Sequence, residues 1–82
     1  MMLFPFIFLR FVAFHDYVGS TAALERRING MAALYGRPLW LTEFGIGRWD
    51  PPDGPPREEQ DAYMTDVLPM LEANEHIYRY AW

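Results

Sequence analysis

Apolar residues are distributed along the chain in two patterns, which alternate. Residues 6–17, 39–44 and 77–82 are dense in aromatic and branched side chains, as β-strands are. Over residues 22–35 and 58–71 the apolar side chains instead recur every three or four positions, which is typical of helices that bury one side. The chain is therefore predicted to fold in the order strand, helix, strand, helix, strand.

The boundaries of the predicted helices carry recognisable signals. Ser20 or Thr21 is suited to cap the first helix, and Gly36 is suited to the left-handed conformation that ends many helices. Gly30 lies inside the first helix and is expected to weaken it by about 1 kcal/mol. Pro69 lies near the end of the second helix and is expected to kink or end its last turn.

Alternating strands and helices indicate an α/β fold in which parallel strands are joined by right-handed crossovers. Two architectures have this order: a small open α/β sheet, or the last three strands (β-α-β-α-β) of a (β/α)8 TIM barrel. A complete barrel of this type needs about 250 residues, so a chain of 82 residues supplies only the last third of one. The apolar stretch over residues 1–10 fits a buried strand, an atypical start or the edge of an earlier element.

Composition and charge narrow the class of protein. With 51% hydrophobic and 17% aromatic residues, the chain is too apolar to be disordered. The formal net charge is −4 and the arginines are scattered, which argues against a nucleic-acid-binding surface. There is no cysteine and no cluster of residues at metal-ligand spacing, so neither a metal nor another cofactor is expected. Residues 1–10 are too short to span a bilayer and lack the features of a signal peptide.

Polar or aromatic residues follow each predicted strand, at the end where (β/α) barrels place their catalytic groups. A carboxylate at the end of an apolar strand is costly to desolvate unless it is paired or functional, which makes Glu43 a candidate catalytic residue. The structural alternative is an ion pair between Glu43 and a nearby arginine, for instance Arg48 or Arg79. The full set of residues at the strand ends is His15, Asp16 and Tyr17 after the first strand, Glu43 after the second and Trp82 after the third.

Strand alternation predicts the direction of the two carboxylates. Because alternate residues share one face of a strand, Glu43 is expected on the face of Leu39 and Leu41. If that face is the interior of a barrel, Glu43 projects into the mouth of the barrel. Asp16 is expected to point away from His15, toward the helices.

Three motifs resemble glycoside hydrolase family 128, whose members are (β/α)8-barrel enzymes acting on β-1,3-glucan. The segment Pro38-Leu39-Trp40-Leu41-Thr42-Glu43-Phe44 is similar to the family strand whose glutamate is the nucleophile. The segment Arg79-Tyr80-Ala81-Trp82 is similar to the strand that closes the family's barrel, and His15 and Tyr17 are similar to its His-x-Tyr element. On this resemblance, residues 11–82 are identified as a partial glycoside hydrolase catalytic barrel.

The resemblance implies a retaining mechanism, in which one carboxylate attacks the anomeric carbon and a second carboxyl group protonates the leaving oxygen. It implies that Glu43 is the nucleophile, that His15 and Tyr17 contact a polysaccharide or oligosaccharide substrate, and that Trp82 offers an apolar face to a pyranose ring. The family's acid/base glutamate lies on an earlier strand, so the chain alone is expected to be inactive. An extracellular or cell-wall location follows if the protein resembles the family in this respect.

Two other functions fit the same residues. In the first, a non-catalytic remnant binds carbohydrate through Tyr17, Trp49 and Trp82 without hydrolysing it. In the second, the chain is a small α/β interaction module, Glu43 is structural and the family likeness is accidental. A genuine small domain would fold alone as a monomer, whereas part of a barrel would expose apolar faces and strand edges and would associate. His15 has its own structural alternative, as a core histidine bonded to a backbone carbonyl.

Overall fold

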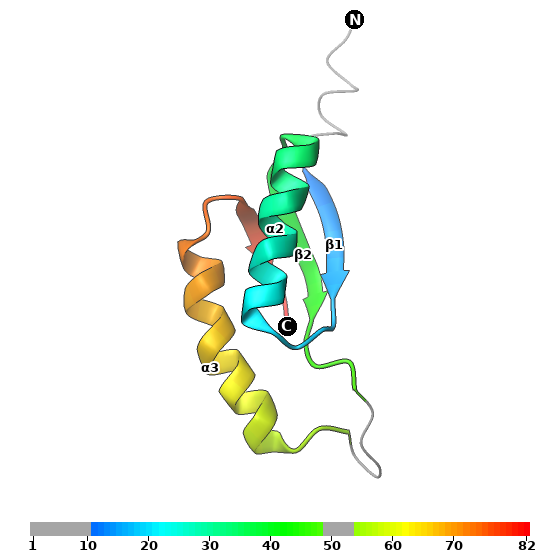
Figure 1. Cartoon of the computed structure of the whole chain (residues 1–82), viewed down its shortest axis with the longest axis vertical. Coiled ribbons are helices and arrows are strands. Elements are labelled where there is room, and N and C mark those ends of the chain that lie inside the picture. The colour runs from blue at the N-terminus through cyan, green and yellow to red at the C-terminus, as the bar shows by residue number, and fades with distance from the viewer. Residues whose placement is uncertain (1–10, 49–53) are drawn as a thin grey trace, which may run out of the picture.

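The computed structural model describes residues 11–48 and 54–82, which form three strands and two helices in alternation (Figure 1). The predicted order of strands and helices is confirmed. The apolar stretch over residues 1–10 and the side chain of Trp49 lie outside the described residues. The elements are β1 (Val12–Asp16), α2 (Thr21–Tyr35), β2 (Leu39–Phe44), α3 (Arg57–Ala73) and β3 (Ile77–Tyr80).

The three strands form one parallel sheet in the order β1-β2-β3, so that β2 is the central strand. Both outer strands end earlier than predicted, β1 at Asp16 and β3 at Tyr80. Right-handed crossovers between neighbouring parallel strands place both helices on one face of the sheet, as can be followed in Figure 1. The described residues are therefore a small two-layer α/β unit, in which they leave the other face of the sheet without a helix.

The helix boundaries agree with the predicted signals, with one exception. Ser20 is the N-cap of α2, and its hydroxyl oxygen accepts a hydrogen bond from the backbone N–H of Ala23 at 3.2 Å. Gly36 ends this helix in the left-handed conformation, with φ 62° and ψ 31°. Pro69 was expected to kink or end α3, but the helix continues past it to Ala73. The last turn thus forms in spite of the N–H that proline lacks.

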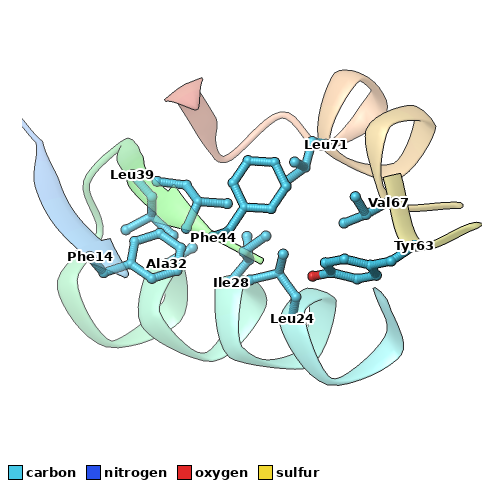
Figure 2. Close-up of a cluster of buried hydrophobic side chains, with 10 residues drawn as sticks. Phe14, Leu24, Ile28, Ala32, Leu39, Phe44, Tyr63, Val67 and Leu71 are labelled. Carbon is cyan, nitrogen blue, oxygen red and sulfur yellow. The ribbon is translucent and has the colours of Figure 1, made fainter. Parts of the chain in front are cut away.

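A hydrophobic core lies between the sheet and the two helices (Figure 2). Burying one large aliphatic side chain stabilises a fold by about 1.5–3 kcal/mol, so the core decides which face of each strand points to the helices. The buried residues come from the sheet (Phe14, Leu39, Leu41, Phe44), from α2 (Leu24, Ile28, Ala32) and from α3 (Tyr63, Val67, Leu71).

The central strand β2 does not keep one alternation of faces along its length. Leu39 and Leu41 are completely buried against the helices, whereas more than half of the Glu43 side chain is exposed. The prediction that Glu43 shares a face with Leu39 and Leu41 is therefore wrong. Glu43 lies on the face of the sheet that the helices leave open.

A β-bulge at Thr42 is the cause. Phe14 of β1 is paired with Leu41, but the next residue of β1, His15, is paired with Glu43. Thr42 is therefore one extra residue on β2, and such an insertion reverses the faces of the residues that follow it. The hydroxyl of Thr42 donates a hydrogen bond to the carbonyl oxygen of Phe14 at 3.1 Å. The bulge thus turns the carboxylate of Glu43 away from the core.

Candidate active site

The bulge brings Glu43 next to two side chains at the end of β1. The phenol of Tyr17 donates a hydrogen bond to Oε1 of Glu43, and Nε2 of His15 lies 3.6 Å from Oε2 of the same carboxylate. The rings of His15 and Tyr17 lie edge to face, with their centroids 6.2 Å apart. About half of each of these three side chains is exposed to solvent. The carboxylate is therefore held on one oxygen and accessible to a ligand.

Glu43 in turn changes the acidity of its neighbour. Its hydrogen bond raises the pKa of the Tyr17 phenol above the ordinary value of 10.0, and desolvation and the charge of the carboxylate raise this pKa further. Tyr17 therefore stays protonated at neutral and mildly alkaline pH. It can act as a permanent hydrogen-bond donor that fixes the direction of the Glu43 carboxylate.

Asp16 points toward the helices, as strand alternation predicted, and does not join Glu43. Its side chain is 1% exposed and forms an ion pair with Arg27 of α2, in which Nη1 lies 3.1 Å from Oδ2. The other carboxylate oxygen of Asp16 accepts a hydrogen bond from the backbone N–H of Val18 at 3.2 Å. Asp16 is thus a buried and fully paired carboxylate. Arg27 was not predicted as part of this region.

Two loops at the C-terminal end of the sheet are hydrogen-bonded to each other. The N–H of Gly45 donates to the carbonyl oxygen of Asp16 at 3.1 Å, and the N–H of Gly47 donates to that of Tyr17 at 2.7 Å. A Cβ atom on Gly47 would lie 2.5 Å from the Cβ of Tyr17. Position 47 therefore has no room for a side chain unless Tyr17 moves. Sequence analysis missed this role, because a loop glycine carries no sign of what lies beside it.

Trp82, the fourth predicted site residue, has its contacts on the other side of β2. Its ring lies edge to face with Phe44, with centroids 5.1 Å apart, and 6.3 Å from the ring of Tyr63 on α3. About half of Trp82 is nevertheless exposed. The structure thus brings together three of the four predicted residues, and it places Trp82 at the same end of the sheet but beside the core.

The arginines considered as partners of Glu43 make other contacts. Nη2 of Arg48 lies 2.5 Å from Oε2 of Glu59 on α3. The guanidinium of Arg79 lies 5.2 Å from the ring centre of Tyr78. Within the described residues, the contacts of the Glu43 carboxylate are therefore with a phenol and an imidazole. The arginine alternative does not describe this site.

The described parts of the chain were also searched for metal ligands and for membrane spans. In residues 11–48 and 54–82, no three His, Cys, Asp or Glu side chains gather in a way that would hold a metal ion. Neither helix within those same ranges is long and apolar enough to cross a membrane. The site is therefore described in terms of its carboxylate, phenol and imidazole.

Comparison with known proteins identifies the family. The family model for the glycosyl hydrolase catalytic core matches residues 8–82. The chain is also similar to alkali-sensitive linkage protein 1 of Schizosaccharomyces pombe (strain 972 / ATCC 24843), with 38% identity over 72 residues. This match covers 88% of the chain but only 13% of that protein. The chain belongs to the glycosyl hydrolase catalytic core family.

Proposed function

We propose that this chain contributes the nucleophile side of a retaining glycoside hydrolase site, with Glu43 as the nucleophile. The observation that carries the proposal is the position of Glu43, an accessible carboxylate at the C-terminal end of the central strand of a parallel sheet. Parallel α/β folds bind their substrates at this end of the strands. Membership of the glycosyl hydrolase catalytic core family supports cleavage of a glycosidic bond as the reaction.

The neighbours of Glu43 suit a nucleophile. A carboxylate that attacks an anomeric carbon must be ionised, accessible and fixed in direction before the substrate arrives. The phenol of Tyr17 fixes Oε1, while Oε2 faces His15 at 3.6 Å. In this proposal Oε2 is the attacking oxygen, and His15 and Tyr17 also contact hydroxyl groups of the sugar.

The reaction transfers the glycosyl group first to Glu43 and then to water. The Glu43 oxygen forms a bond to the anomeric carbon, while a second carboxyl group about 5–5.5 Å away gives its proton to the leaving oxygen. That second group then takes a proton from the water that releases the sugar. Asp16 is buried and paired with Arg27, so it is not proposed for this role. We assign the role to a residue outside these 82.

We further propose that residues 11–82 are the last three strands of a (β/α)8 barrel of glycoside hydrolase family 128. Parallel strands in chain order with both helices on one face support this, because barrel strands turn their other face to the interior. His15 and Glu43 lie on that open face. The motif resemblance supports β-1,3-glucan as the substrate, and the half-exposed Trp82 is our candidate for stacking against a sugar ring.

Covalent labelling tests the proposal on the 82-residue chain. In 2-deoxy-2-fluoro-β-laminaribiosyl fluoride, fluoride leaves without needing a proton, so the reagent requires a nucleophile but no acid/base residue. We expect intact mass spectrometry to show one added disaccharide on the native chain and none on Glu43→Gln. The corresponding cellobiosyl reagent is the control for linkage, and equal labelling by both reagents would remove the preference for β-1,3-glucan.

A carbohydrate-binding protein without catalysis is the second candidate, since Tyr17 and Trp82 are both about half exposed at one end of the sheet. Family membership removes the third candidate, the interaction module whose family likeness was accidental. Titration with laminarihexaose, followed by NMR, separates the two remaining functions. Shifts of the Tyr17 and Trp82 signals in a chain that is never labelled would favour binding without hydrolysis.

A further inference from the structure

The strongest unassigned feature is the buried ion pair between Asp16 and Arg27. Among the described residues, Asp16 is the one polar or charged residue in the buried class, at 2% exposure. It lies on the strand face that otherwise contributes Phe14 to the core. An apolar residue would satisfy such a position at lower cost, because a buried charge must be paired and hydrogen-bonded. The presence of a charge there calls for a reason other than packing.

The contacts of the pair supply that reason, because they hold the backbone on both sides of Tyr17. Nη1 of Arg27 donates to the carbonyl oxygen of His15 at 2.6 Å and to Oδ2 of Asp16 at 3.1 Å. Oδ1 of Asp16 accepts from the N–H of Val18 at 3.2 Å. The peptide groups just before and just after residues 16 and 17 are therefore fixed by side chains rather than by the sheet.

His15 and Tyr17 are the two side chains that contact Glu43. They flank Asp16 in sequence and extend to the open face, whereas the Asp16 side chain extends to the helices. A change in backbone direction at residue 16 would move both of them relative to Glu43. The hydrogen bond between Gly47 and the Tyr17 carbonyl holds the same segment from the side of the β2 loop.

We propose that Asp16 and Arg27 are positioning residues, which hold His15 and Tyr17 in place so that Tyr17 orients the Glu43 carboxylate. This inference rests on the proposed role of Glu43 as a nucleophile. Neither positioning residue contacts the substrate. They act from the helix side of the sheet, through the backbone of β1, on a carboxylate on the opposite side.

The acidity of Tyr17 provides a readout that is independent of catalysis. The pKa of this phenol is raised mainly by its hydrogen bond to Glu43, and the titratable side chains beside it are Glu43 and His15. If Tyr17 swings away from Glu43, its pKa falls toward 10. NMR of chains carrying 13C-labelled tyrosine measures this value, and the signal is assigned with Tyr17→Phe.

Three variants test the inference. Arg27→Gln removes the bridge, Glu43→Gln removes the acceptor, and Arg26→Gln is the matched control because Arg26 is the exposed neighbour on the same helix. We expect Arg27→Gln and Glu43→Gln each to lower the pKa of Tyr17, with no further fall when they are combined. Arg26→Gln should leave this pKa raised. A Tyr17 pKa that stays at the native value in folded Arg27→Gln would overturn the inference.

A fourth variant decides the question if Arg27→Gln fails to fold. Replacing both members of a buried ion pair by apolar residues is often neutral or stabilising, so Asp16→Leu/Arg27→Met should fold. We expect it to have a lowered Tyr17 pKa, and its labelling by the laminaribiosyl fluoride should slow by roughly 10- to 100-fold. Native pKa and native labelling in this variant would refute the positioning role. If the native chain is not labelled at all, the proposed function fails while the comparison of Tyr17 pKa values still tests the inference.

Discussion

Gly47→Ala is predicted to destabilise the chain and to separate Tyr17 from Glu43. The added Cβ would lie 2.5 Å from Cβ and 2.9 Å from the carbonyl oxygen of Tyr17. The first distance is about 1 Å shorter than the roughly 3.5 Å at which two carbon atoms attract each other. The loop must therefore move, and the hydrogen bond from the Gly47 N–H to the Tyr17 carbonyl is strained or lost.

The magnitude follows from three terms. Overpacking of this kind costs about 1–3 kcal/mol, and losing the hydrogen bond costs about 0.5–1.5 kcal/mol. Gly47 does not have a positive φ, so alanine is compatible with its backbone and regains about 0.4–1 kcal/mol through the unfolded state. The net loss in the free energy of unfolding is about 1–3 kcal/mol, because the overpacking term is the largest.

Urea unfolding and the Tyr17 pKa together form the assay, with two other glycines as controls. A Cβ on Gly30 meets no atom within 4 Å, so Gly30→Ala in the middle of α2 should stabilise the chain by about 0.5–1 kcal/mol. Gly36 has open space but a φ of 62°, so Gly36→Ala should destabilise without lowering the Tyr17 pKa. The reasoning is refuted if Gly47→Ala matches the native chain in both stability and Tyr17 pKa.

Other predictions concern the core. Burial raises the pKa of Tyr63 to about 12, helped by the charges of Asp16 and Asp66; the associated stability is therefore complete below pH 10 and is lost as the pH rises toward 12, by up to about 2.7 kcal/mol. The Tyr63 hydroxyl has no partner among the described residues, so Tyr63→Phe should raise the unfolding free energy by about 1 kcal/mol and weaken this alkaline loss in urea titrations at several pH values; an unchanged alkaline loss would assign it to other tyrosines. Leu41 is completely buried and Leu34 is 74% exposed, so Leu41→Ala should cost about 2–5 kcal/mol and Leu34→Ala less than about 0.5 kcal/mol. Similar losses at the two positions would contradict the core described above.

The elements were predictable because local chemistry and burial agree. In α2 the spacing of Leu24 and Ile28 marks the side that is buried, and Ser20 and Gly36 mark its ends. Pro69 shows where local chemistry alone fails. Leu71 lies beyond it and is 2% exposed, and burying its side chain offsets the hydrogen bond that proline removes.

The face of Glu43 was not predictable, because it depends on a pairing between strands. Strict alternation assigns Glu43 to the side of Leu41, and nothing in the sequence of β2 marks Thr42 as an extra residue. The bulge becomes visible only when the register with β1 is known, where the Thr42 hydroxyl bonds to the carbonyl of Phe14. A single residue of shift reverses every later side chain.

Arg27 was missed for a different reason. An arginine among polar neighbours on a helix has the pattern of a solvated surface residue, and 45% of its side chain is in fact exposed. The usable signal was Asp16, a charged residue predicted to face the helices. A buried carboxylate requires a cation or several donors, and the helix that follows β1 is the nearest source of one.

Peptide mapping of the chain labelled with 2-deoxy-2-fluoro-β-laminaribiosyl fluoride tests the central claim most directly. The carboxylate at the end of β2 displaces fluoride from the anomeric carbon, so tandem mass spectrometry should locate the disaccharide on Glu43. Glu59 and Glu72 serve as internal controls, since they are carboxylates on α3, at 42% and greater exposure respectively. Label on Glu43 that disappears in Glu43→Gln is the predicted result. Label on the α3 carboxylates, or label that persists in Glu43→Gln, would contradict the assignment of Glu43 as the nucleophile.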